Sequence, residues 1–258
     1  MKFRPCIDIH NGKVKQIVGS SLKDNSDPTE NFVSGNGADF YAKLYKENGL
    51  PGGHIIILNK FGTPEYEDSK NEAMKAFKEY PNGLQIGGGI TDTNASDFIK
   101  MGASHVIVTS YLFENGKLSF ERMKRLNDSV SKKNIVFDLS CKKVQDKYFI
   151  ATDRWQTITD TCMNSDLLNE LSGYCDEYLI HAVDVEGKQN GPELDIIKEL
   201  SLYKGNAITY AGGIRSYQDI EAVRDASNGR IDYTIGSALD IFGGNLKFSK
   251  VANEYTDR

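Results

Sequence analysis

Eight short apolar segments alternate with eight segments of helical spacing along this chain of 258 residues. The apolar segments are nearly continuous, as in His-Ile-Ile-Ile-Leu, which is typical of strands buried on both faces of a parallel sheet. The strand candidates are residues 3–9, 54–58, 84–86, 105–108, 135–139, 178–183, 207–210 and 231–235. The helix candidates are residues 38–47, 69–80, 94–101, 118–130, 165–174, 192–202, 217–226 and 246–255. This order predicts an α/β protein with the (β/α)8 or TIM-barrel fold, with a doubly wound open sheet as the alternative.

Local sequence signals mark three of the helix starts. Asp92-Thr93-Asn94 offers capping side chains, and Ser216 is followed three residues later by Asp219, as in a capping box. Pro192 is predicted in the first turn of its helix, where proline is favoured.

Three pairs of segments repeat about half a chain length apart, as expected of a barrel built from two half-barrels. The pairs are residues 7–9 with 137–139, 86–90 with 210–214, and 107–110 with 234–237. We therefore expect one domain over 1–258, with half-barrels of approximately 1–130 and 131–258. Equivalent strands of such a barrel lie on opposite sides of its axis, so Asp8 and Asp138 are predicted to face each other.

Composition excludes several classes of protein. The formal net charge of −5 offers no global basic field for nucleic acid. The longest clean aliphatic run, residues 55–58, is far below the roughly 18 to 20 residues of a membrane span. The N-terminus lacks a basic segment followed by an apolar one, so we expect a soluble, cytoplasmic protein without a secretory signal. The four cysteines form no CxxC pair and the four histidines have no zinc-ligand spacing, which predicts a reducing compartment and no metal.

Asp8 and Asp138 each lie near the end of an apolar strand, at the face where barrel enzymes carry out their chemistry. A single aspartate at a strand end often only caps the following loop. Two at symmetric positions favour general acid and base catalysis, because two carboxyls in different environments can divide those roles.

Glycine turns follow the third and seventh strands, and each turn precedes a helix. Such turns expose backbone N–H groups that suit a phosphate, although a tight turn alone would explain one glycine pair. The next strand in each half ends in a small polar pair that can add further donors to the same site. The candidate phosphate-binding residues are Gly88, Gly89, Thr109 and Ser110 at one site and Gly212, Gly213, Gly236 and Ser237 at the other. Residues 239–244 are predicted to form the short extra helix common at barrel phosphate sites.

Four other residues are weaker candidates on the residues alone. Trp155 is either a hydrophobic plug at the barrel rim or a stacking surface for a planar ligand. His10 and His181 lie at strand ends, where a histidine is more often a satisfied polar residue than a catalyst. Cys141 is interpreted as a buried thiol, because no base is paired with it.

Six segments together carry a resemblance that spans the chain. They are CIDIHNGKVKQIVG at 6–19, GGGI at 87–90, DLSCKK at 138–143, WQTITD at 155–160, HAVDVEG at 181–187 and GSALDIFGGN at 236–245. In this combination the chain resembles the phosphoribosylformimino-aminoimidazole-carboxamide ribotide isomerases of histidine biosynthesis, and most closely their eukaryotic, fungal-type branch.

The resemblance implies an Amadori rearrangement of the aminoaldose ProFAR to the aminoketose PRFAR, with no cofactor. Asp138 matches the family's general acid and Asp8 its general base. The glycine turns with their small polar partners match the two phosphate sites. Gly19 matches a glycine that closes near the substrate, and Trp155 matches the aromatic that stacks on the imidazole.

Several positions depart from the commoner bacterial pattern. The catalytic threonine of the sixth strand is Ala182 here, and Glu186 approximates an aspartate of the following loop. Thr91 and Ser237 stand where arginines are common, whereas Arg215 follows the second Gly-Gly-Ile turn. Which cation balances which phosphate is therefore open.

The expected partner is one bisphosphorylated small molecule, bound by a monomer. The nearest rival is the sister cyclase of the next step, imidazole glycerol phosphate synthase, which needs a glutaminase partner. A catalytically silent phosphate-binding barrel is the rival from another class. Activity on the related phosphoribosylanthranilate is left open, because the arginines that support it in dual-substrate relatives are not identifiable here.

Overall fold

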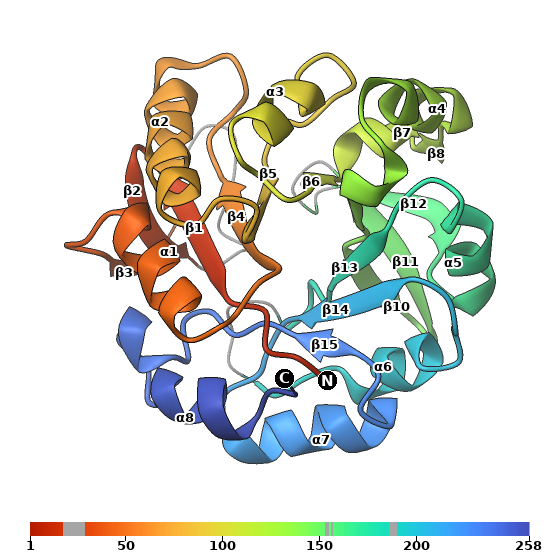
Figure 1. The fold of residues 1–258 in the computed structure, drawn as a ribbon. Coiled ribbons are helices and arrows are strands. Elements are labelled where there is room, and N and C mark those ends of the chain that lie inside the picture. The colour runs from red at the N-terminus through yellow and green to blue at the C-terminus, as the bar shows by residue number, and fades with distance from the viewer. Residues whose placement is uncertain (18–28, 153–154, 156, 186–189, 258) are drawn as a thin grey trace.

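The computed structural model describes residues 1–17, 29–152, 155, 157–185 and 190–257, and it contains the predicted eight-stranded parallel barrel. The barrel strands are β1 (Cys6–His10), β4 (Gly53–Ile57), β5 (Leu84–Gly87), β6 (Val106–Val108), β9 (Ile135–Asp138), β13 (Glu177–His181), β14 (Ala207–Ala211) and β15 (Asp232–Tyr233). They lie side by side in their order along the chain (Figure 1). The ring closes where Arg4 N–H donates to the Tyr233 carbonyl at 2.8 Å and Tyr233 N–H donates to the Lys2 carbonyl at 3.0 Å. The open doubly wound sheet is thereby excluded.

The eight α-helices of the described residues lie around the outside of the ring (Figure 1). They are α1 (Ala38–Glu47), α2 (Pro64–Glu79), α3 (Ala95–Lys100), α4 (Phe120–Ser129), α5 (Ser165–Leu171), α6 (Leu194–Leu200), α7 (Tyr217–Ser227) and α8 (Phe248–Glu254). Ser216 and Asp219 form the predicted capping box, and α3 begins directly after Asn94. The prediction for Pro192 was wrong, because α6 begins only at Leu194. Glu193 is held by Tyr210 and Tyr148, whose hydroxyls bond its N–H and its carboxylate, and it ends the preceding loop.

The core has two parts, one on each face of the barrel sheet. The larger part lies between sheet and helices and contains side chains such as Phe137 and Tyr178, both fully buried. The smaller part lies apart from it and comprises Ile107, Val136 and Leu179 with Ala211. Both faces of the strands are therefore buried, as their continuous apolar character predicted.

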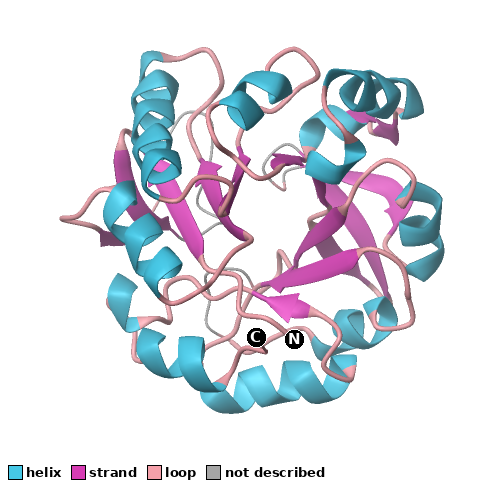
Figure 2. Cartoon of the chain, in the orientation of Figure 1, coloured by secondary structure: helices cyan, strands magenta, loops and turns pink. Residues whose placement is uncertain are grey.

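Additional antiparallel strands extend this plan, and the sequence analysis predicted none of them. β2 (Lys13–Ile17) and β3 (Glu30–Val33) continue the sheet beyond β1. β10 (Cys141–Val144), β11 (Lys147–Thr152) and β12 (Thr157–Cys162) form a separate three-stranded sheet after β9 (Figure 2). The shorter elements are β7 (Phe113–Glu114), β8 (Lys117–Leu118) and the 3-10 helices η2 (Ser110–Leu112), η3 (Lys132–Asn134) and η4 (Asp240–Phe242). Helix η4 confirms the predicted extra helix after the last strand.

Asp8 and Asp138 stand four strands apart in the closed ring; Asp138 ends β9, and Asp8 lies two residues before the carboxyl end of β1. Symmetric positions of the repeat therefore occupy opposite sides of the barrel. The division into half-barrels of 1–130 and 131–258 stays a prediction. Within the described residues, no helix combines the length and the apolar character that a membrane span requires.

Candidate active site

A cavity of about 590 Å³ lies at the carboxyl ends of the barrel strands. Its wall includes every described residue of the principal predicted site. These are Asp8, Gly88, Gly89, Thr109, Ser110, Asp138, Trp155, Gly212, Gly213, Gly236 and Ser237. The two carboxylates and the two glycine turns, far apart in the sequence, thus share one cavity.

Three of the predicted residues, His10, Ala182 and Arg215, do not line the described part of this cavity. His10 ends β1 and is buried, and Ala182 is buried beside Cys141, with which it forms a single parallel bridge. Arg215 is half exposed and lies 3.8 Å from the Asp219 carboxylate. Gly19 and Glu186 lie outside the described residues.

Asp138 ends β9 and is buried among three hydrogen-bonding side chains. Its Oδ1 lies 2.9 Å from Nδ1 of His181 and accepts from the Ser140 hydroxyl at 3.3 Å. Its Oδ2 accepts from the Thr109 hydroxyl at 3.2 Å. The hydroxyl of Thr109, a residue predicted at a phosphate site, is therefore bonded to the Asp138 carboxylate, and Thr109 also lines the cavity.

Asp8 has a different environment, set by the β1–β2 hairpin. The side-chain amide of Gln16 donates to Asp8 Oδ2 at 3.0 Å from the neighbouring strand β2. Gln16 is buried, and it occupies space that a Cβ on Gly236 would take. A neutral amide thus contacts one aspartate, whereas an imidazole and two hydroxyls surround the other.

His54 on β4 lies at the cavity wall, as His181 does, and it is buried. Burial, and then repulsion from His181, lowers the pKa of the His54 imidazole to about 3. His54 is therefore neutral near pH 7. No group of three or more His, Cys, Asp or Glu side chains within the described ranges is arranged to hold a metal ion. Cys141 is buried, which confirms the interpretation as a buried thiol, and burial raises the pKa of this thiol to about 12.

Both glycine turns require glycine for steric reasons. Gly88 has φ +113°, and a Cβ there would overlap the carbonyl oxygen of Ile57. Gly213 has φ +76°, and a Cβ there would overlap the carbonyl oxygen of Gly191. Close backbone approach at both turns is compatible with a phosphate bound to backbone N–H groups.

Substituting Gly88→Ala is expected to lower the free energy of unfolding by about 1–3 kcal/mol, since alanine strongly disfavours that backbone conformation. Denaturant unfolding measures the change. Gly173→Ala is the matched control, because Gly173 is exposed and a Cβ there meets nothing within 4 Å. Equal stability of the Gly88 and Gly173 variants would contradict the steric account.

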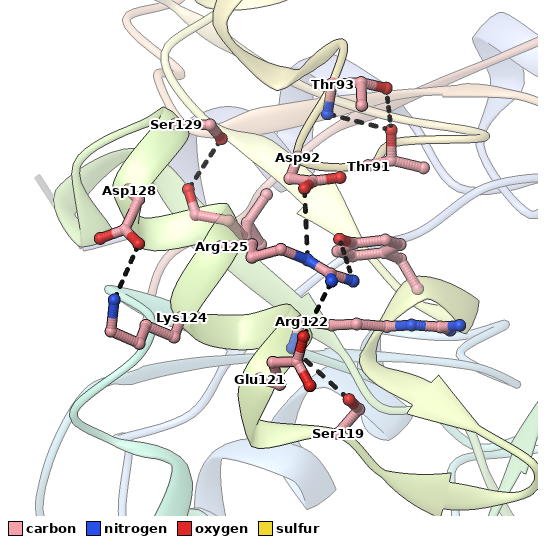
Figure 3. A network of polar contacts seen from close by, with 12 residues as sticks. Thr91, Asp92, Thr93, Ser119, Glu121, Arg122, Lys124, Arg125, Asp128 and Ser129 are labelled. Carbon is pink, nitrogen blue, oxygen red and sulfur yellow. Dashed lines mark hydrogen bonds and ion pairs between the residues drawn. The ribbon is translucent and has the colours of Figure 1, made fainter.

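The rim of the first glycine turn is tied to α4 by Arg125 (Figure 3). The Arg125 guanidinium lies 3.5 Å from the Asp92 carboxylate and 3.0 Å from that of Glu121. It also donates to the hydroxyl of Tyr111, a cavity-lining residue, at 3.4 Å. Arg125 thereby connects the loop before α3 with η2, the two segments that flank this end of the cavity.

The described cavity wall contains one lysine, Lys60, and no arginine. Lys60 lies in the loop after β4, next to Phe61, whose side chain packs close to Gly89. It is the cation that the described wall offers an anionic ligand near the first glycine turn.

Trp155 lies between β11 and β12, at φ +68°, and is partly buried at the cavity wall. Its ring centre is 6.5 Å from that of His181, with an angle of 45° between the planes. The antiparallel sheet that the sequence analysis missed therefore carries Trp155 to the cavity.

Sequence reasoning missed Gln16, His54, Ser140 and Lys60 as cavity residues and ranked His181 as a weak candidate. For His181 a signal was present, because the ends of neighbouring parallel strands lie together and its strand follows that of Asp138. For Gln16 the sequence carries no such signal, since its contact with Asp8 depends on strand β2, which was not predicted.

Fold and cavity define the class of protein, a (β/α)8 barrel with two facing carboxylates at the face where barrel enzymes have their active sites. The chain belongs to the family described as histidine biosynthesis protein, whose model matches residues 2–246.

Relatives from plants and fungi agree with this assignment. The chain is 48% identical over 256 residues to a chloroplastic isomerase of Medicago truncatula, covering 97% of this chain and 80% of the relative. It is 44% identical to a Neurospora crassa protein, covering 94% and 93%, and 45% identical to one from Saccharomyces cerevisiae, covering 95% and 94%. All three are named 1-(5-phosphoribosyl)-5-((5-phosphoribosylamino)methylideneamino) imidazole-4-carboxamide isomerase.

Proposed function

We propose that this chain is the aldose–ketose isomerase that converts ProFAR to PRFAR in L-histidine biosynthesis. The observation that carries the proposal is the pairing of Asp8 and Asp138 at opposite sides of one cavity, in a family whose named members catalyse this reaction. Isomerisation of an aminoaldose needs one group that gives a proton and one that removes a proton, and the cavity offers both.

Asp138 is the general acid in this proposal. It gives a proton to the ring oxygen of the aminoribose, which keeps the electron pair of the broken C1–O bond. The nitrogen lone pair then forms the C1=N bond, and the product of this step is an open-chain iminium ion. The iminium serves as the electron sink for the next step, so the reaction requires no cofactor.

Asp8 is the general base. It removes the proton from C2, and the electron pair of the C2–H bond neutralises the iminium and leaves an enolamine. In the final step C1 gains a proton and the C2 hydroxyl loses one, which gives the ketone and returns the carboxyl groups to their starting protonation. The neutral Gln16 amide orients Asp8 without supplying a titrating partner.

The two glycine turns would hold the two phosphates, with the imidazole between them near Trp155. Lys60 would balance part of the charge at the first turn. Backbone dipoles would supply the rest, because the net charge of −5 does not attract a bisphosphorylated ligand.

The decisive experiment mixes the purified protein with ProFAR in the absence of ammonia and glutamine and follows formation of PRFAR. We expect PRFAR to accumulate. A cyclase would leave ProFAR unchanged and would consume PRFAR, supplied in its place, only when ammonia is added. Binding of ProFAR without turnover would indicate a silent barrel. The same assay with phosphoribosylanthranilate tests the second substrate.

Substituting Trp155→Ala is expected to weaken binding of the imidazole-bearing substrate more than binding of inorganic phosphate. The reason is that aromatic stacking contributes about 0.5–1.5 kcal/mol beyond area burial, which phosphate does not gain. Titration calorimetry with both ligands measures the difference. An equal loss of affinity for both ligands would favour the alternative interpretation of Trp155 as a hydrophobic plug at the barrel rim.

The monomeric state and the cytoplasmic location belong to the proposal as well. Sedimentation velocity tests the first. Fractionation of the source cells tests the second, for which the chloroplastic name of the Medicago relative gives the alternative of an organelle.

A further inference from the structure

His181 and Asp138 form a buried pair at the cavity. Their strands β13 and β9 are parallel neighbours in which Leu179 lies opposite Asp138, so the two strand ends meet. His181 Nδ1 is 2.9 Å from Asp138 Oδ1, and both side chains are almost removed from solvent, with 14% and 11% exposed. At this distance and burial the two groups share a hydrogen bond.

The surroundings of Asp138 raise a chemical problem for a lone acid. Thr109 and Ser140 both donate hydroxyls to its oxygens. Donors to a carboxylate favour its ionised form, which has no proton to give. An imidazole in contact with the carboxylate solves the problem, because imidazole holds a proton near neutral pH.

Resting on the proposed function, we propose that His181 and Asp138 share one transferable proton and act together as the general acid. Before the reaction the pair carries two protons, one on an imidazole nitrogen and one shared between Nδ1 and the carboxyl. Asp138 passes one of them to the substrate ring oxygen as the C1–O bond breaks. The proton passed on is the shared one, so His181 is left neutral, with its remaining proton on Nε2, next to the ionised carboxylate. The proton released by the C2 hydroxyl at the last step restores the pair.

Other titratable groups lie around His181, and two of them keep one protonation state near neutral pH. From β4, His54 stays neutral, since burial and the charge of His181 lower its pKa to about 3. From β10, the Cys141 thiol stays protonated, with a pKa raised to about 12. Asp184, in the loop after β13, accepts from the backbone N–H of Lys143 at 2.8 Å. Asp8 and Lys60 line the same cavity.

His181 is thus a positioning and proton-holding residue that acts through Asp138, and His181→Asn tests this role. Asparagine can keep a hydrogen bond to the carboxylate but cannot hold the additional proton. We expect the single-turnover rate at neutral pH to fall at least about tenfold, part of the roughly 10²–10⁴-fold that general acid catalysis contributes. We expect KM to stay within about threefold, and the alkaline limb of the pH–rate profile to move to lower pH.

His105→Gln is the matched control, because His105 precedes β6 at the opposite end of the barrel and pairs with Asp176 at 3.5 Å. It should leave rate and pH profile unchanged. An unchanged alkaline limb in His181→Asn, or the same shift in His105→Gln, would overturn the shared-proton proposal. Should Asp138→Asn lose activity while His181→Asn keeps the normal profile, only this inference fails. Normal activity of Asp138→Asn would instead refute the proposed function.

A measurement that does not depend on activity completes the test. NMR titration of the His181 imidazole in the wild-type protein should give a midpoint at higher pH than in Asp138→Asn, because the carboxylate stabilises the imidazolium. Equal midpoints would contradict the pairing, even where His181→Asn proved too unstable to assay.

Discussion

The Asp138→Asn variant is expected to turn over ProFAR at least about 10²-fold more slowly than the wild-type protein, within the roughly 10²–10⁴-fold range of general acid–base catalysis. The amide has nearly the shape of the carboxyl but cannot give a proton to the ring oxygen, so the sugar ring stays closed. Substrate affinity should remain largely intact, because the glycine turns and Trp155 bind the ligand elsewhere in the cavity. Steady-state kinetics separates kcat from KM.

Asp128→Asn is a suitable control for this variant. Asp128 lies on the exposed face of α4, where it pairs with Lys124 at 3.0 Å (Figure 3). Its substitution should change neither kcat nor KM. A rate near that of wild type in Asp138→Asn would remove Asp138 from the mechanism.

Asp8→Asn is expected to have an effect of similar size, at least about 10²-fold on kcat, because no base then removes the C2 proton. The Gln16 amide, 3.0 Å from Asp8 Oδ2, can still hold the asparagine side chain through its oxygen. The cavity should therefore keep its shape, and KM should change little.

Asp97→Asn controls for a general effect of lost charge, since Asp97 lies on α3 outside the cavity wall and pairs with Lys100 at 3.6 Å. The assignment of Asp8 as base would be refuted if kcat held and KM alone rose. That result would make Asp8 a binding residue.

The barrel could be predicted because its strands carry an unambiguous signal. Strands buried on both faces, such as β4, are continuously apolar, and the helices between them have clear starts, such as Ser216 with Asp219. The sheet of β10, β11 and β12 could not be predicted in this way. Its outer strands are largely exposed and rich in lysine and threonine, so they carry no hydrophobic pattern that distinguishes them from a loop.

The candidate site was likewise predictable only in part. Asp8, Asp138 and the glycine turns were found because the carboxyl ends of parallel strands meet at one face. The contacts that these residues make could not be predicted, since they depend on strand register. His181 meets Asp138 through the pairing of β13 with β9, and Gln16 meets Asp8 through the unpredicted strand β2. The role of the Thr109 hydroxyl could not be predicted either, because its hydrogen bond to Asp138 is seen only in the folded structure.

The most direct test of the proposed proton transfers follows the C2 hydrogen of the substrate. ProFAR deuterated at C2 of the aminoribose is mixed with the wild-type protein, and with Asp8→Asn, without ammonia or glutamine. We expect the wild-type protein to form PRFAR more slowly from labelled than from unlabelled substrate, and Asp8→Asn to form it at least about 10²-fold more slowly than wild type. Failure of the wild-type protein to form PRFAR, or a near wild-type rate in Asp8→Asn, would contradict the account.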